Sequence, residues 1–219
     1  MSNDFWENYK VRLEPWATDY DTPISLSQEE SISETAIDLN VEGCDWVKRK
    51  PNSEPTLPKK IIFVDGRRRL DARFLGFDGN EILYGAFATI SVGAVLVDCT
   101  TCRANCLEPI IRRAIALGGG RPAPLTHIPC PLGSSAELTY DLCLTTSDNE
   151  PQTPLALIQK AMLQEEARLA MEFVNEPDVL VVRDGPLLYG SYKVPGSTIG
   201  YVKTMGRGYL TGDYALVTS

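Results

Sequence analysis

Two aspartates follow apolar runs in similar contexts along the chain. The run IIFVDG ends with Asp65 before a glycine, and VLVVRDG ends with Asp184 before a glycine. The segment before the second run has apolar residues at helical spacing and carries Glu165, Glu166 and Glu172. Ligands bind at strand ends in sheets that helices cover, so we expect these carboxylates to converge in one crevice.

Converging carboxylates repel one another unless a cation neutralises them, and sites made only of oxygen ligands favour Mg²⁺ or Mn²⁺. Paired ions of this kind activate water and stabilise the departing oxygen in phosphodiester cleavage. A single Asp-Gly after a strand is usually only a turn, and glutamates on a helix usually face solvent. The repeated arrangement, with a carboxylate-bearing helix between its copies, adds weight to the catalytic interpretation, and the structural interpretation stays open beside it.

Basic residues follow the first aspartate directly. Arg67, Arg68, Arg69 and Arg73 lie just downstream of Asp65. In an extended segment, alternate members of this run can contact phosphates while the others face solvent. The simpler alternative is a solvated basic run without a ligand.

A cysteine cluster is a second candidate site. Cys99, Cys102 and Cys106 are closely spaced, and His127 and Cys130 follow downstream. Thiolate and imidazole ligands can hold a structural zinc ion, and thiolates can hold an iron–sulfur cluster. The alternative is that these cysteines pack as small apolar residues in the core.

Composition limits the class of protein. The chain has 219 residues, 43% of them hydrophobic, and a formal net charge of -8, with 12 of the 29 acidic residues in the first 60. This charge means that an anionic substrate must be held by local basic clusters and by metal ions. No apolar run approaches the roughly 20 residues that span a bilayer, and the first residues lack the pattern of an export signal. We therefore expect a cytoplasmic protein without a membrane partner.

Helices and strands must position these residues. The sequence divides the chain into two parts, an N-terminal arm and a folded domain. Residues 1–59 read as an acidic arm and linker, with a docking helix over residues 4–13 that Asp4 caps and Pro15 ends, and a short helix near 29–38. The folded domain begins at Lys60 and extends to Ser219. It starts with a strand that ends in an Asp65-Gly66 turn, a second strand to Phe77, a hairpin turn at 77–80, and one or two strands over 81–98.

The second half of the domain is less regular. Residues 99–154 are rich in glycine and proline and read as a semi-ordered insertion with one helix over 107–117. A long helix is predicted from Thr153 as N-cap, followed by Pro154, to about Asn175. A buried strand then ends at Asp184, and one more strand is expected in the tail.

Five segments, taken together, resemble one family. IIFVDGRRRLDARF, YGAFATISVGAVLV, IQKAMLQEEARLAMEF, VLVVRDGPL and IGYVKT resemble, in this order, the NurA family of DNA-repair nucleases over roughly residues 60–204. The resemblance implies an α/β, ribonuclease-H-like mixed sheet with flanking helices. It also implies a Mn²⁺- or Mg²⁺-dependent exonuclease and single-strand endonuclease. Such an enzyme acts on DNA in end resection and double-strand break repair, as a homodimer, beside a HerA-type hexameric ATPase.

The resemblance also implies roles for particular residues. Asp65 and Asp184 match the family's metal-binding aspartates, and Glu166 matches its helix glutamate, with Glu165 as the second choice. Lys203 is expected near the scissile phosphate or the adjacent DNA backbone. Among the arginines, Arg67, Arg69 and Arg73 are expected to contact nucleic acid.

The sequence departs from the family pattern at its end. The family closes its site with a histidine beyond the YVKT strand, whereas the chain's single histidine, His127, lies upstream of it. Three explanations stay open: the sequence is an N-terminal fragment, a partner chain completes the site, or catalysis is impaired. Of these we expect the fragment, with a sheet incomplete at its C-terminus and weak or absent nuclease activity of this chain alone. Two other functions stay open: an ATPase or kinase-type phosphotransferase on the same kind of fold, and a non-catalytic interaction module.

Overall fold

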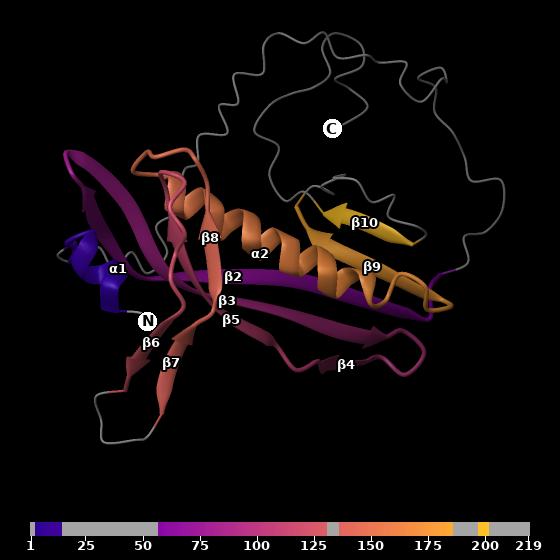
Figure 1. Ribbon diagram of the computed structural model, residues 1–219. Coiled ribbons are helices and arrows are strands. Elements are labelled where there is room, and N and C mark those ends of the chain that lie inside the picture. The colour runs from indigo at the N-terminus through magenta and orange to yellow at the C-terminus, as the bar shows by residue number, and fades with distance from the viewer. Residues whose placement is uncertain (1–2, 15–56, 131–135, 186–196, 202–219) are drawn as a thin grey trace, which may run out of the picture.

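The computed structural model describes residues 3–14, 57–130, 136–185 and 197–201, which form an α/β fold around a mixed sheet (Figure 1). The main path of this sheet has the strand order β10-β9-β2-β3-β5-β8, and β1 and β4 pair with β2 and β3 beside it. The helix α2 (Thr153–Met171) lies along one face of the sheet.

The centre of the sheet is antiparallel. β2 (Lys60–Asp78) and β3 (Glu81–Asp98) form a long hairpin, and β5 (Ile110–Leu117) pairs with β3 over 85–92. The hairpin turn needs a residue with positive φ, which Gly79 supplies with φ 61°. β4 (Arg103–Cys106) pairs with the last four residues of β3.

Parallel strands extend the sheet on the other side of β2. β9 (Val179–Asp184) runs parallel to β2, and β10 (Thr198–Tyr201) runs parallel to β9. α2 precedes β9 in the chain, as a crossover between parallel strands requires. β2 therefore has an antiparallel neighbour on one side and a parallel neighbour on the other.

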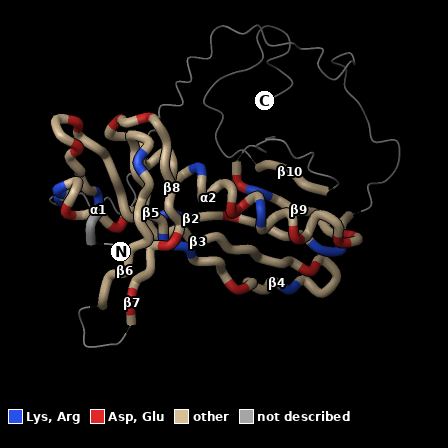
Figure 2. Tube along the Cα trace, viewed as in Figure 1, with Lys and Arg blue, Asp and Glu red and all other residues tan. Residues whose placement is uncertain are grey.

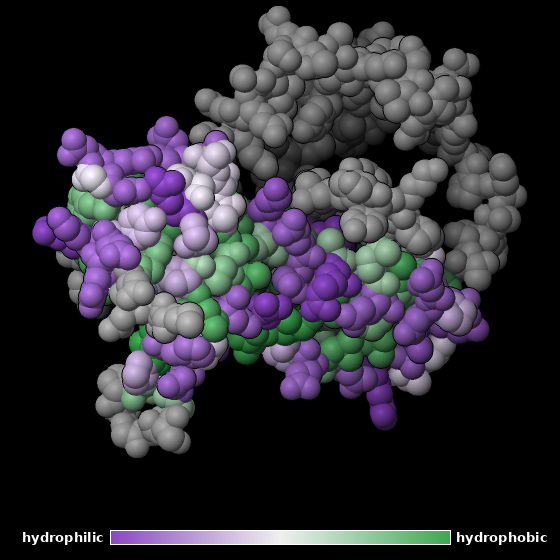
Figure 3. All heavy atoms as spheres, in the orientation of Figure 1, coloured by the Kyte–Doolittle hydropathy of each residue, from purple (hydrophilic) through white to green (hydrophobic). Residues whose placement is uncertain are grey.

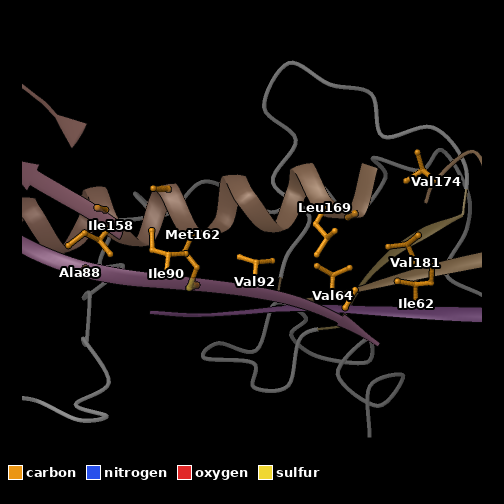
Figure 4. Packing of buried hydrophobic residues seen from close by; sticks show 14 of the residues in the cluster. Ile62, Val64, Ala88, Ile90, Val92, Ile158, Met162, Leu169, Val174 and Val181 are labelled. Atoms are coloured by element: carbon orange, nitrogen blue, oxygen red, sulfur yellow. The ribbon is translucent and has the colours of Figure 1, made fainter. Parts of the chain in front are cut away.

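The main core lies between α2 and the sheet face beneath it, which we call the inner face. Ile158, Met162 and Leu169 point from the helix onto strand residues that include Ile90 and Val64 (Figure 4). Side chains alternate along a strand, so the even-numbered residues of the first half of β2 face inward. The odd-numbered residues point to the opposite face, which we call the outer face.

A second core covers the far end of the outer face. Phe74, Phe87 and Tyr140 pack there with Trp6 from α1 (Asn3–Asn8), which stacks on Phe87 at 5.7 Å between ring centroids. The remaining small strands are β1 (Arg12–Leu13), β6 (Thr126–Pro129), β7 (Glu137–Tyr140) and β8 (Leu142–Thr145). Residues 3–14 thus pack on the domain.

A β-bulge separates the two halves of β2. The register with β3 shifts between Leu70 and Ala72, so Asp71 is the extra residue. An extra residue reverses the alternation of side chains, so after the bulge the even-numbered residues face outward, Phe74 among them. One strand can therefore contribute apolar side chains to both cores.

Several expectations from the sequence are wrong. Asp65-Gly66 is not a turn, because β2 runs through it without interruption. Residues 110–117 form β5 and not a helix, since Ala114 to Leu117 are buried at every position between neighbouring strands. The described part of residues 99–154, the segment expected as a semi-ordered insertion, contains the strands β4 to β8.

The expected helices need smaller corrections. The N-terminal helix ends at Asn8 and not near residue 13, and Leu13 lies in β1 with 66% of its surface exposed. The long helix is confirmed, but it ends at Met171, and its N-cap is Gln152 and not Thr153. The hairpin at 77–80 and the strand ending at Asp184 are confirmed, and β10 is part of the expected tail strand. The helix expected near 29–38 lies outside the described residues.

Charged residues are interspersed along the described chain (Figure 2). In the view of Figure 3, hydrophilic side chains lie along α2 and a band of hydrophobic residues lies below it, along the strands. Among the described residues, no helix has both the length and the apolar character needed to cross a membrane.

Candidate functional site

Two predicted site residues lie side by side on adjacent parallel strands. In the register of β2 with β9, Val64 pairs with Arg183, and both side chains are buried on the inner face. The next residues along the two strands are Asp65 and Asp184, and the alternation of side chains directs both toward the outer face. Asp65 is exposed and Asp184 is half-buried. The structure thus brings these two carboxylates to neighbouring positions at the end of β9.

The third predicted carboxylate approaches from the inner face. Glu166 lies on α2, is only 2% exposed, and sits against the backbone of Gly66. A Cβ built on Gly66 would collide with Glu166 Oε1 and would lie 3.0 Å from Met162 Cγ. A side chain at this position would therefore push the glutamate away from the strand.

Glu166 lies in a charged environment that contains both aspartates. Burial raises the pKa of Glu166 to about 7, the negative charges of Asp65 and Asp184 add to the rise, and Arg183 opposes it. Arg183 Nη2 lies 3.6 Å from Glu166 Oε2 and donates to the carbonyl of Leu163 at 3.4 Å. The pair is almost fully buried, with 4% and 3% of the two side chains exposed.

The donor set fits a divalent cation. All three groups are carboxylates, and the buried Glu166 Oε2 has no hydrogen-bond partner among the described residues. As the described residues stand, however, no three His, Cys, Asp or Glu side chains lie close enough together to hold a metal ion. An ion would have to draw in Glu166 from one side of the strand end and the two aspartates from the other.

The other glutamates of α2 point elsewhere. Glu165 accepts a hydrogen bond from Arg168 Nε at 2.9 Å and lies 3.8 Å from Arg112. Glu172 pairs with the same Arg168 at 3.4 Å. These ion pairs hold Glu165 and Glu172 at the surface of α2 and beside β5. Of the neighbouring pair Glu165 and Glu166, it is therefore Glu166 that is buried against β2.

The basic run divides between the two faces of β2. Arg67 and Arg69 lie on the outer face, in the same alternation as Asp65, and both are exposed. Arg68 points inward and donates a hydrogen bond to Gln159 of α2, and burial lowers its pKa. Arg73 lies beyond the bulge, where it is half-buried. Lys203 lies outside the described residues.

The cysteine cluster lies at the turn between β3 and β4. Cys99, Cys102 and Cys106 are exposed free thiols, so the expectation that they pack in the core is wrong. No metal-binding group of three or more His, Cys, Asp or Glu occurs in the part of the chain that the structure describes, these cysteines included. His127 lies in β6, where its ring contacts Thr139 at 3.2 Å and Glu137 at 3.4 Å.

Sequence reasoning missed two residues of this site. The sequence shows Arg183 at the end of an apolar run, and a charged residue within a buried run is itself a signal of a buried partner. Gly66 after Asp65 indicates a turn, but a glycine within a strand also marks close approach of another group. Comparison of the chain with protein-family models gives no match, and comparison with curated proteins gives none either.

Proposed function

We propose that this chain is a metal-dependent DNA nuclease of the NurA type, built on a ribonuclease-H-like fold. The strand order supports the fold, since β2 lies between the antiparallel β3 and the parallel β9, and α2 precedes β9. The observation that carries the function is the placement of Asp65 and Asp184 on adjacent parallel strands with Glu166 buried against Gly66.

In this proposal Asp65, Glu166 and Asp184 hold Mn²⁺ or Mg²⁺. The ion would supply an activated water and would stabilise the charge that develops on the leaving oxygen of a phosphodiester. Glu166 must be ionised to act as a ligand, and its pKa of about 7 means that the protein alone does not fully ionise it at neutral pH. Arg183 favours the ionised form, and a bound cation would favour it further.

The resemblance alone supports the rest of the proposal. This remaining part of the proposal includes exonuclease and single-strand endonuclease activity in DNA end resection, a homodimer, and a HerA-type ATPase as partner. Lys203 and Arg73 belong to it as candidate DNA-contacting residues. A structural zinc ion at Cys99, Cys102 and Cys106 would be a separate site.

A titration with Mn²⁺ tests the site before any turnover is measured. An ion that binds only the folded state at 100 times its Kd stabilises that state by about 2.7 kcal/mol, which raises Tm by about 5–10 °C for a chain of this size. We expect Asp65→Asn, Asp184→Asn and Glu166→Gln to lose this gain. Glu165→Gln is the matched control, because it removes a carboxylate one residue away that faces Arg112 and Arg168. Equal gains in all five proteins would contradict the proposal.

A non-catalytic interaction module is the second candidate. Two observations favour it: the described carboxylates do not gather at ligating distance, and Glu166 already has a buried cationic partner in Arg183. In that case Mn²⁺ leaves Tm unchanged in the wild type, and single-stranded DNA is not degraded in its presence.

A further inference from the structure

Two of the exposed cysteines occupy opposite positions in the hairpin turn that joins β3 to β4. Asp98 and Arg103 are the last paired residues of the two strands, so Cys99 and Cys102 come next, with two threonines between them. The Cα atoms of residues three apart in a turn lie within about 7 Å, and a disulfide needs a separation of about 4.4–6.8 Å. The backbone of this turn therefore suits a disulfide between its first and last residues.

The side chain of Cys102 is directed back across the turn. Cys102 has a φ of 52°, a left-handed conformation that is uncommon for a residue with a side chain. Its Sγ lies 3.9 Å from the carbonyl oxygen of Cys99, as a weak thiol donor. Both cysteines are exposed free thiols, so a small reagent in solution can reach them.

Asp98 fixes the conformation of the turn. Its Oδ1 accepts hydrogen bonds from the Thr100 N–H at 2.8 Å, from Thr100 Oγ1 at 2.5 Å and from the Thr101 N–H at 3.1 Å. The Cys99 N–H donates to the carbonyl of Lys59 at 2.8 Å, which attaches the start of the turn to the residue before β2. These bonds hold the two cysteines in place before any bond joins them.

We propose that Cys99 and Cys102, here called the cysteine pair, form a reversible disulfide by exchange with a low-molecular-weight disulfide. One protein thiolate attacks the small disulfide, forms a mixed disulfide with it and releases one small thiolate. The other protein thiolate then attacks the protein sulfur of the mixed disulfide, which closes the ring and releases the second small thiolate. Two electrons pass from the cysteine pair to the small disulfide, and the two thiol protons end on its two thiol products.

The ring would act on a weakly held part of the sheet. β4 is exposed at all four of its positions and, among the strands that the structure describes, pairs only with β3 (Figure 1). A strand with few buried contacts and exposed hydrogen bonds opens at low cost in free energy. A disulfide at the turn ties one end of β4 to β3. Oxidation should therefore slow the exchange of the amide protons by which β4 bonds to β3.

Equilibration of the full chain with reduced and oxidised glutathione tests the pairing. Acid quenching, alkylation and digestion with trypsin follow. Trypsin cleaves after Arg103, which leaves the cysteine pair in peptide 74–103 and Cys106 in peptide 104–112. We expect peptide 74–103 to lose two hydrogen atoms and to carry no added group, while Cys106 is alkylated. Cys106→Ser is the matched control, because it removes an exposed thiol at the other end of β4, and it should form the ring like the wild type.

The same equilibrium in urea separates the native turn from the short spacing of the two cysteines. The native turn has already fixed backbone that the unfolded chain must fix when the ring closes, so the equilibrium constant should be at least about tenfold larger in the native chain. Asp98→Ala removes the acceptor of three hydrogen bonds and should lower the native value by about threefold or more. Asp98→Asn keeps an oxygen acceptor and should restore most of this loss.

Three results would overturn the proposal. The first is a peptide 74–103 with two alkylated cysteines at every glutathione ratio, or a cross-link between this peptide and peptide 104–112. The second is an equilibrium constant that neither urea nor Asp98→Ala changes, because spacing alone would then explain the ring. The third is a zinc ion that copurifies with the chain and protects Cys106 and the cysteine pair together from alkylation. All of these measurements are made without Mn²⁺ or DNA, so their outcome is independent of the nuclease proposal.

Discussion

Replacing Gly66 by alanine should displace Glu166, and the size of the effect follows from the packing. The added methyl group would overlap Glu166 Oε1 and would lie 3.0 Å from Met162 Cγ and 3.1 Å from Glu166 Cγ. Overpacking of this kind costs about 1–3 kcal/mol. Replacing a glycine returns about 0.4–1 kcal/mol through the unfolded chain. The net expectation is a loss of about 1–2 kcal/mol of folding free energy.

Gly93→Ala provides the control. Gly93 lies on the adjacent strand, in the row next to Gly66 and on the opposite face, where no described atom is within 4 Å of the new methyl group. Only the gain through the unfolded chain remains, so this variant should be more stable by about 0.4–1 kcal/mol.

Urea denaturation at pH 7 measures both changes. With an m value of about 2 kcal/mol/M, Gly66→Ala lowers the midpoint by about 0.5–1 M, and Gly93→Ala raises it by about 0.2–0.5 M. In a background of Glu166→Ala, the cost of Gly66→Ala should fall by about 1 kcal/mol or more, because the colliding carboxylate is gone. Equal midpoints for the two glycine variants, or a cost that does not depend on Glu166, would refute the assigned contact.

Three further predictions follow from the same contacts. The pKa of Glu166 is raised from 4.5 to about 7, so the folded state binds the proton of this carboxyl more tightly than the unfolded state does. The free energy of unfolding should therefore fall as the pH rises from about 4.5 to 7, and it should level off above pH 7. Urea midpoints across this range measure the fall, and Glu166→Gln should abolish it. Arg183→Met removes the cation that opposes the rise, so the same fall should extend to higher pH. Gly85→Ala places a methyl group where the ring of the buried Phe74 lies, so it should lower the free energy of unfolding by about 3 kcal/mol. Trp6→Ala removes a half-buried ring that stacks on Phe87 and should lower it by about 2 kcal/mol. Thermal unfolding of the two variants measures the difference.

The sequence predicted those elements whose pattern is local. The hairpin at 77–80 depends on a turn glycine, and α2 depends on apolar residues at helical spacing, so both could be read directly. β5 could not, because IIRRAIAL fits a helix and a buried strand equally well, and only its pairing with β3 on one side and β8 on the other decides between them.

The candidate site was predictable in part for a similar reason. Asp65 and Asp184 follow apolar runs, which is a local signal, and the register then places them side by side. The choice between Glu165 and Glu166 depended on a resemblance, and the contact with Gly66 supplies its physical reason. The position of Arg113 on the outer face, beside Thr89 of β3, could not be predicted, because it depends on the strand pairing that the sequence left ambiguous.

The three antiparallel strands β2, β3 and β5 serve both cores, one on each face. Neither core can open without exposing the backbone hydrogen bonds on which the other rests, so the two should melt as one cooperative unit. Amide protons in the middle of these strands should then exchange with solvent only when the whole domain unfolds. Weaker aromatic packing around α1 would therefore lower the free energy of unfolding of the whole domain. The region of the distant carboxylates would unfold more often as a result, although the two regions are not in contact.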